Sequence, residues 1–325
     1  MLTKFITVIE QGNLISEHDK IIVGLSGGPD SVCLFFLLCQ LKKQLNVDLI
    51  AAHLDHGWRS TSSQDVLFCK QLAEQYNVPF ISKHASEITI KKKLYGSSKE
   101  ELGRTLRRQF FSDLLKTEKA NAIAVAHHWD DQIETFFIRL IRGSTIAGLS
   151  CMQAKQDNYI RPLINFKKEE ILAFLHTNNL NYLIDETNES DMFLRNKIRK
   201  YLVPAARETD PRFDSNLKKA INNIQDTNQF IARLVDKNFQ EITDKTSDGY
   251  ILNADKFFDI DTHLHKNLII IWLCKHNVPF PISNAFLNEI IKFFKQPRSG
   301  IHKIHEQWSI IKEKNFLKIS THTAQ

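Results

Sequence analysis

Short apolar runs alternate with segments of helical periodicity through the first half of the chain. Buried strands are predicted for four β-branched or apolar runs, at residues 21–25, 47–54, 79–83 and 122–126. Helices are predicted for the segments between them, at residues 31–45, 62–76 and 99–118. This alternation predicts an α/β fold with a parallel, doubly wound sheet. In such a sheet the ligand site lies beyond the carboxyl ends of the strands.

The pattern changes in the second half of the chain. Apolar residues at helical spacing predict one long helix over residues 217–239, which is followed by shorter helices and by short strands within residues 301–319. We therefore expect three parts: a catalytic domain over residues 1–213, a linking helix over residues 214–249, and a smaller α-rich domain over residues 250–325.

The loop after the first predicted strand has the composition of a phosphate-binding turn. It reads Ser26, Gly27, Gly28, Pro29, Asp30, Ser31. Glycines let the backbone approach an anion closely, N–H groups at a helix start point toward it, and the two serines add hydroxyl donors. Asp30 would repel phosphate unless a cation lay between them, which predicts Mg²⁺. A capped strand-to-helix turn is the alternative. A P-loop is excluded because the chain has no Gly-Lys dipeptide.

Polar residues also follow the second predicted strand. His53, Asp55 and His56 occupy the loop that should lie beside the phosphate-binding turn. We interpret them as a wall that faces the base and ribose of a nucleotide. A plain polar turn is the alternative, and a metal site lacks a clear set of partner ligands.

The loop after the fourth predicted strand carries the second strong signal. Residues 127–134 hold two histidines and three carboxylates, among them His127, Asp131 and Glu134. Asp130 or Asp131 is expected to cap the following helix, but capping does not require so many ionisable groups. Asp131 and Glu134 share a helical face. A zinc hydrolase would need a His-Glu-x-x-His motif, which is absent, so acid–base and Mg²⁺ roles beside a nucleotide are favoured.

The charge balance permits a polyanionic partner. The 325 residues carry a formal net charge of +6, with a pI near 8.9. Arg104, Arg107 and Arg108 fall on one helical face. A second basic segment, residues 192–219, includes Arg195 and Arg199. Solvated helix faces are the ordinary explanation, but beside a nucleotide site RNA contact is favoured.

The remaining composition suggests a cytoplasmic protein that does not enter a membrane. The five cysteines are scattered without a Cys-x-x-Cys pair, so neither a zinc ribbon nor a disulfide framework is indicated. No signal peptide is recognised at the N-terminus, and the apolar runs are too short to cross a bilayer.

Taken together, these stretches resemble the tRNA(Ile)-lysidine synthetases, which are PP-loop ATP pyrophosphatases. The resemblance rests on SGGPDS (26–31), HLDHGWR (53–59), GRTLRR (103–108), AHHWDDQIET (126–135), IRPLI (160–164), DETN (185–188) and RNKIRKYLVP (195–204). It implies that ATP activates a cytidine in the CAU anticodon of an isoleucine tRNA, through an adenylated intermediate, before free L-lysine is attached. AMP and pyrophosphate would be released.

The resemblance also implies roles for individual residues. It places ATP at residues 26–31. Catalytic roles are expected for Asp30, Arg107, His127, Asp131 and Glu134, with Mg²⁺ at Asp30 and Asp131. Contact with tRNA is expected for Arg104, Arg108, Arg195, Asn196 and Arg199. Arg108 stands where the family often has tyrosine. The chain ends before a further C-terminal domain that many members carry, as a natural short form or a truncation would.

Two alternative functions stay open. A PP-loop tRNA thiolase with an iron–sulfur cluster would need grouped cysteines, which this chain lacks. A nucleotide-regulated RNA-binding protein would not need the carboxylates of residues 130–134. The oligomeric state is not specified by the sequence, and a homodimer is one candidate arrangement.

Overall fold

The computed structural model describes residues 1–42, 44–58, 62–89, 99–184, 194–280 and 283–321. The chain divides into two compact units, residues 1–224 and 225–325. The dividing point lies inside the long helix α10 (Phe213–Ile242), so it differs from the expected boundary at residue 213. The three-part division therefore stays a prediction, and each unit is described by itself.

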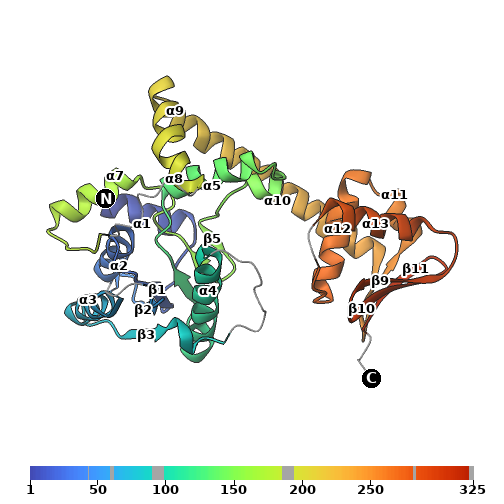
Figure 1. Cartoon of the computed structure of the whole chain (residues 1–325), viewed down its shortest axis with the longest axis horizontal. Helices are drawn as coiled ribbons and strands as arrows, with labels where there is room; N and C mark the ends of the chain where they lie inside the picture. The colour runs from blue at the N-terminus through green and yellow to red at the C-terminus, as the bar shows by residue number, and fades with distance from the viewer. Residues whose placement is uncertain (43, 59–61, 90–98, 185–193, 281–282, 322–325) are drawn as a thin grey trace. The chain divides into compact units, whose positions relative to one another are not determined.

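The described residues of the first unit form a six-stranded sheet with the order β3-β2-β1-β4-β6-β5 (Figure 1). Its strands are β1 (Lys20–Gly24), β2 (Asp48–Asp55), β3 (Phe80–His84), β4 (Ala122–Ala124), β5 (Lys155–Gln156) and β6 (Tyr159–Ile160). All neighbouring pairs are parallel except β5 with β6. The predicted parallel α/β fold is confirmed. The four predicted strands are present, and their ends lie within two residues of the expected ones.

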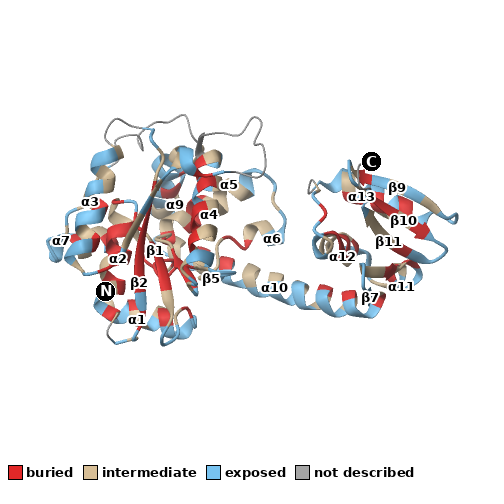
Figure 2. Cartoon of the chain, turned by 90° about the horizontal axis from the view of Figure 1, so that it is seen from below, coloured by how far each residue is buried: buried red, intermediate tan, exposed pale blue. Residues whose placement is uncertain are grey.

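Helices cover both faces of this sheet. The helices of the first unit are α1 (Leu2–Gln11), α2 (Pro29–Leu41), α3 (Ser62–Gln75), α4 (Lys99–Thr117), α5 (Trp129–Ile141), α6 (Ile146–Leu149), α7 (Lys168–Thr177), α8 (Leu194–Lys197) and α9 (Val203–Thr209). A 3₁₀ turn (Ala85–Glu87) follows β3, and a π-helical turn (Ile198–Leu202) joins α8 to α9. Figure 2 shows the buried strands β1 and β2 between α2 and α3 on one side and α4 on the other.

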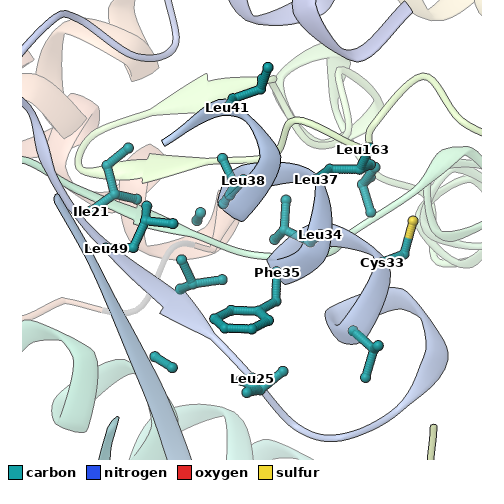
Figure 3. Close-up of a cluster of buried hydrophobic side chains, with 14 of the residues drawn as sticks. Ile21, Leu25, Cys33, Leu34, Phe35, Leu37, Leu38, Leu41, Leu49 and Leu163 are labelled. Atoms are coloured by element: carbon teal, nitrogen blue, oxygen red, sulfur yellow. The ribbon is translucent and has the colours of Figure 1, made fainter. Parts of the chain in front are cut away.

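Alternation along β1 divides the core between the two faces. Ile21 and Val23 belong to a cluster with α1, α2 and α7, whereas Ile22 packs with Phe110 and other residues of α4. Helix α2 is apolar on almost every side because β1 and β2 cover it on one side and α7 on another. Figure 3 shows this cluster, in which Ile21 and Leu38 lie together. The packing fixes the start of α2 at the carboxyl end of β1.

The second unit is a mixed α/β structure. Its described strands form an antiparallel five-stranded sheet of order β7-β8-β11-β10-β9. The elements are β7 (Thr243–Thr246), β8 (Gly249–Asn253), α11 (Ala254–Asp259), α12 (Thr262–Lys275), α13 (Asn284–Lys295), β9 (Gly300–His305), β10 (Trp308–Glu313) and β11 (Phe316–Thr321). The C-terminal strands were expected as short segments. They form a full sheet because β10 pairs on both sides and β8 adds to β11.

No helix within the described residues is both long and apolar enough to cross a membrane. The 30-residue helix α10 is amphipathic rather than uniformly apolar, and its apolar residues enter the cores of the two units separately. Residues 217–239, predicted as one long helix, lie entirely within it.

Candidate active site

The turn between β1 and α2 is held by its own hydroxyl groups. The backbone N–H and the hydroxyl of Ser26 both lie within hydrogen-bond distance of Ser31 Oγ, at 3.2 and 3.1 Å. The Ser31 hydroxyl donates to the Gly28 carbonyl at 2.9 Å. The two serines therefore shape the loop, and their hydroxyl groups already have partners within it.

The two glycines meet different requirements. Gly27 has a φ of +85°, and a Cβ there would lie 2.6 Å from Leu183 Cδ1. A side chain at this position would be both strained and in collision. Gly28 has ordinary backbone angles and precedes Pro29, the first residue of α2. Among the described residues, a Cβ at Gly28 would meet nothing closer than Ser26 Oγ at 3.7 Å, so these residues leave space on the outer side of the loop.

The N-terminus of α2 is suited to bind an anion. Gly28 is its N-cap residue, and no side chain there accepts a hydrogen bond from the first turn. The first N–H groups of a helix lack intrahelical partners and carry the positive end of the helix dipole. The predicted phosphate contact of residues 26–31 therefore matches the local backbone arrangement.

Asp30, in the first turn of α2, is held by two cationic groups. Its Oδ1 lies 2.6 Å from Lys168 Nζ and 3.6 Å from His128 Nε2. Burial alone would raise the pKa of Asp30, but His128 and Lys168 together lower it below the ordinary value. Asp30 is therefore a carboxylate at neutral pH.

His128 brings the predicted Mg²⁺ ligands together. Its Nε2 lies 3.6 Å from Asp30 Oδ1 and 3.5 Å from Asp131 Oδ2, and its Nδ1 lies 3.6 Å from Asp130 Oδ2. Burial opposes the charged ring, but the surrounding carboxylates raise the pKa of His128. Asp131 also accepts the His128 backbone N–H at 3.0 Å. Because α5 begins at Trp129, His128 is the N-cap residue, and the two aspartates lie in the first turn rather than at the cap.

The carboxylates fit a magnesium ion that also binds substrate. Within the described part of the chain, no group of three histidine, cysteine, aspartate or glutamate side chains could hold a metal ion alone. Mg²⁺ in nucleotide sites is usually held by one or two carboxylates together with phosphate oxygens and water. Asp30 and Asp131 approach the same ring nitrogen and can supply those two carboxylates.

Glu134 is buried between two arginines of the predicted tRNA-binding segment. Its carboxylate is 2% exposed and lies 2.9 Å from Arg195 Nε and 2.6 Å from Arg199 Nε. Burial raises the pKa of Glu134 above its ordinary value, while Arg199 and Arg195 oppose that rise. The sequence predicted a catalytic role for Glu134 and tRNA contact for the two arginines. In the structure both arginine side chains form ion pairs with that of Glu134. Asn196 lies on α8 beside Arg195, and Arg199 lies in the π-helical turn that follows.

His127 lies near a group of arginines. Burial lowers the pKa of His127 to about 4, and Asp131 opposes this effect while Arg161 and Arg107 add to it. Its Nδ1 is buried and has no hydrogen-bond partner among the residues that the structure describes. Burial also lowers the pKa of Arg107, with a further contribution from Arg104, although the Arg107 side chain is exposed.

The polar residues expected in the loop after the second strand lie near this group, but His53 and Asp55 belong to β2 itself and only His56 follows it, because β2 continues to Asp55 in pairing with β3. His53 is buried, and its Nδ1 lies 2.9 Å from the Leu25 carbonyl oxygen at the end of β1. Asp55 accepts the Gly57 N–H at 2.8 Å. His56 stacks on Trp58 with ring centroids 4.4 Å apart, and burial followed by the charge of Arg107 lowers its pKa to about 4. The expected wall therefore contains a structural histidine, a turn carboxylate and a neutral stacked ring.

Sequence reasoning missed several residues that contact the predicted ones. Lys168 reaches Asp30 from α7, and Arg161, mostly buried, lies near Arg108. Arg207 contacts both Asp130 and Asp214, at 2.8 and 3.1 Å. In the sequence, only the basic residues near 161–168 and 199–212 could have indicated these contacts. No local pattern shows which residue far along the chain will be the partner. Arg59 and residues 185–188, which belong to the motifs, lie outside the described residues.

Comparisons with known proteins match the chain to one family and to several named relatives. A family model described as a PP-loop domain matches residues 1–206. A tRNA(Ile)-lysidine synthase of Clostridioides difficile is 36% identical over 263 residues, which is 78% of this chain and 56% of that protein. A tRNA(Ile)-lysidine synthase of Bacillus cereus is 29% identical over 297 residues, which is 89% of this chain and 62% of that protein. The chain thus spans 56–62% of the length of these two relatives.

A solved structure shows the same fold. The U34-tRNA thiolase from Methanococcus maripaludis, solved with an iron–sulfur cluster, is similar with a TM-score of 0.59 and 19% identity. The similarity covers 69% of this chain and 78% of that one. At this level of identity the comparison concerns the fold and not the reaction.

Proposed function

The chain belongs to the PP-loop domain family, and we propose that it uses ATP to attach lysine to the wobble cytidine of an isoleucine tRNA with a CAU anticodon. The observation that carries this proposal is the match to relatives named tRNA(Ile)-lysidine synthase over 78–89% of the chain. That match is longer than the first unit, residues 1–224, and it therefore includes part of the second unit.

The loop at residues 26–31 would bind the pyrophosphate part of ATP. The open first turn of α2 offers N–H groups, and Gly28 leaves the outer side of the loop accessible. Asp30 and Asp131 would hold Mg²⁺ together with phosphate oxygens. Bound Mg²⁺ would neutralise phosphate charge and so favour attack at the α-phosphorus.

The proposed reaction has two steps. The cytosine carbonyl oxygen attacks the α-phosphorus, an oxygen–phosphorus bond forms, and the bond to pyrophosphate breaks. A lysine amine then attacks the ring carbon that carries this oxygen. A carbon–nitrogen bond forms, AMP leaves with the oxygen, and the amine loses its proton. The loop grips pyrophosphate and supplies no lysine of its own, so cleavage falls between the α- and β-phosphates.

The chain's residues can position these groups. Asp131 is a carboxylate within reach of both the Mg²⁺ site and His127. The His127 ring is neutral at pH 7. Arg107 and the arginines beside it supply positive charge near the developing phosphate negative charge. Glu134 holds Arg195 and Arg199 in place for the tRNA.

The test is mass spectrometry of nucleosides from isoleucine tRNA after incubation with the protein, ATP and lysine. We expect one cytidine per CAU anticodon to become heavier by lysine minus water, with AMP and pyrophosphate as co-products. Asp30→Ala should abolish the modification, whereas Asp48→Ala, at an exposed position of β2, should not. ADP as the main product, or modification of the base without lysine, would contradict the proposal.

A further inference from the structure

The strongest unexplained contact in the site is the ion pair between Lys168 and Asp30. The Nζ–Oδ1 distance is 2.6 Å, although 138 residues separate the two positions in the sequence. Both side chains remain partly accessible, at 34% and 29% exposure. A pair that only stabilised the fold would be expected deeper in the core or at the outer surface, not beside an open anion-binding helix start.

The backbone that carries Lys168 is held firmly. The Lys168 N–H donates to Asp130 Oδ2 at 2.8 Å, and the preceding Phe166 carbonyl accepts the Trp129 N–H at 2.8 Å. Phe166 and Ile171 on either side are fully buried in the core that contains α2. The backbone of Lys168 is therefore fixed beside the first turn of α2, and only its side chain is left to move.

The position of Lys168 is electrostatically unfavourable for a lysine. It is the first residue of α7, where the helix dipole is positive and a cation lowers stability. The ammonium also lies beside the first turn of α2, through its contact with Asp30, and its charge acts against that of a protonated His128. Asp30 offsets this concentration of positive charge in the absence of ligand. A phosphate group would offset it with more charge and more acceptor oxygens.

We propose that Lys168 is the pyrophosphate-binding cation of this site and that it exchanges Asp30 for the nucleotide's phosphate oxygens. It supplies from α7 the ammonium that the loop at residues 26–31 does not contain. The exchange leaves the Asp30 oxygens free for the cation that accompanies the nucleotide. This inference rests on the proposed use of ATP and extends it to a residue outside the loop.

The neighbouring Lys167 provides a matched control. Its Nζ lies 2.6 Å from Asp214 Oδ2, so its ammonium is engaged by the start of α10 rather than by the loop. Lys167→Ala and Lys168→Ala remove the same group from adjacent residues of one helix start. Lys168→Arg keeps the charge and tests whether a cation of different shape can replace the ammonium.

The test is calorimetric titration of the full chain with ATP, with inorganic pyrophosphate and with AMP, each in the presence of Mg²⁺. Lys168→Ala should weaken binding of ATP and pyrophosphate about tenfold or more, since it removes a charge-assisted contact. Binding of AMP should be unchanged, and Lys168→Arg should recover part of the loss. Lys167→Ala should resemble the wild-type protein for all three ligands.

The outcomes separate this inference from the proposed function. If the wild-type protein binds ATP and Lys168→Ala binds ATP and pyrophosphate equally well, the inference is wrong while ATP use stands. Equal weakening of AMP binding would also overturn it, because that would indicate a general distortion of the site. If the folded wild-type protein binds neither ATP nor pyrophosphate, the proposed function is wrong, and so is the proposed role of Lys168.

Discussion

Burial and charge separate two histidines that are adjacent in the sequence. His128 lies among Asp30, Asp130 and Asp131, and these carboxylates outweigh burial and raise its pKa. His127 faces arginines, and burial lowers its pKa to about 4. Two neighbouring rings with pKa values displaced in opposite directions are typical of a site that handles both protons and charged ligands.

His127 should make the protein less stable in mild acid. Its pKa is about 4 in the folded state, against about 6.5 for an unperturbed histidine. Between these values the unfolded state binds more protons, so stability falls as pH drops from about 6.5 to about 4. The effect is on the order of 3 kcal/mol when the full difference in pKa is realised. His127→Asn should flatten the dependence of the melting temperature on pH in this window.

The control for this prediction is His18→Asn, since His18 is exposed in a loop of the same unit. Melting temperatures measured from pH 4 to pH 7.5 for the three proteins would give the comparison. A His127→Asn protein with the wild-type slope would show that His127 is not the group that titrates. A His18→Asn protein with an equally flattened slope would show the same.

At the scale of elements, local patterns predicted the elements but not the contacts between them. Strand β1 could be predicted from residues 21–25 because apolar β-branched residues are enriched in buried strands. The predicted helix over residues 31–45 ends at Leu41, where the apolar run that packs on the sheet also ends. The antiparallel sheet of the second unit was underestimated because β8 and β11, which pair with each other, lie more than 60 residues apart.

The same limit applies to the site. The turn at residues 26–31 and the residues after β4 were found because their chemistry is contiguous in the sequence. The pairing of Lys168 with Asp30, and of Arg199 with Glu134, arises only when α7 and the segment after α8 pack beside α2 and α5. The sequence placed Arg195 and Arg199 in one basic segment, but it could not show that a buried carboxylate holds both.

This packing predicts a stability role for the π-helical turn after α8. Arg199→Ala should lower the free energy of unfolding by about 1–2 kcal/mol, because it leaves the buried Glu134 with one arginine instead of two. Lys197→Ala, two residues earlier and exposed, should stay within about 0.5 kcal/mol of the wild type. Urea denaturation of the three proteins would measure the difference.

The companion variant Glu134→Gln sharpens this measurement. In that background Arg199→Ala should cost less, because the buried charge that the arginine compensates has been removed. Equal costs in both backgrounds would mean that Arg199 stabilises the protein by some other contact.

At the scale of the whole molecule, the net charge of +6 is modest and its placement matters more than its size. Some basic residues are paired with carboxylates of the protein: Lys167 and Arg207 with Asp214, Arg195 and Arg199 with Glu134. Arg104 and Arg108 on α4 are exposed. A basic sequence segment and a basic surface are therefore not the same, and exposed arginines should contribute more to binding a polyanion.

The salt dependence of tRNA binding can test this distinction. Each phosphate contact adds roughly 0.7–0.9 to the slope of log affinity against log salt. We expect the double variant Arg104→Ala with Arg108→Ala to reduce the slope by about one to two units. Arg199→Ala should reduce it less, because Arg199 already donates to Glu134 at 2.6 Å and is only partly available to a phosphate. Filter binding at several salt concentrations gives the slopes, and ATP binding by each variant shows whether the nucleotide site is intact. A larger loss of slope for Arg199→Ala than for the α4 double variant would place the main tRNA contact at the segment after α8 instead.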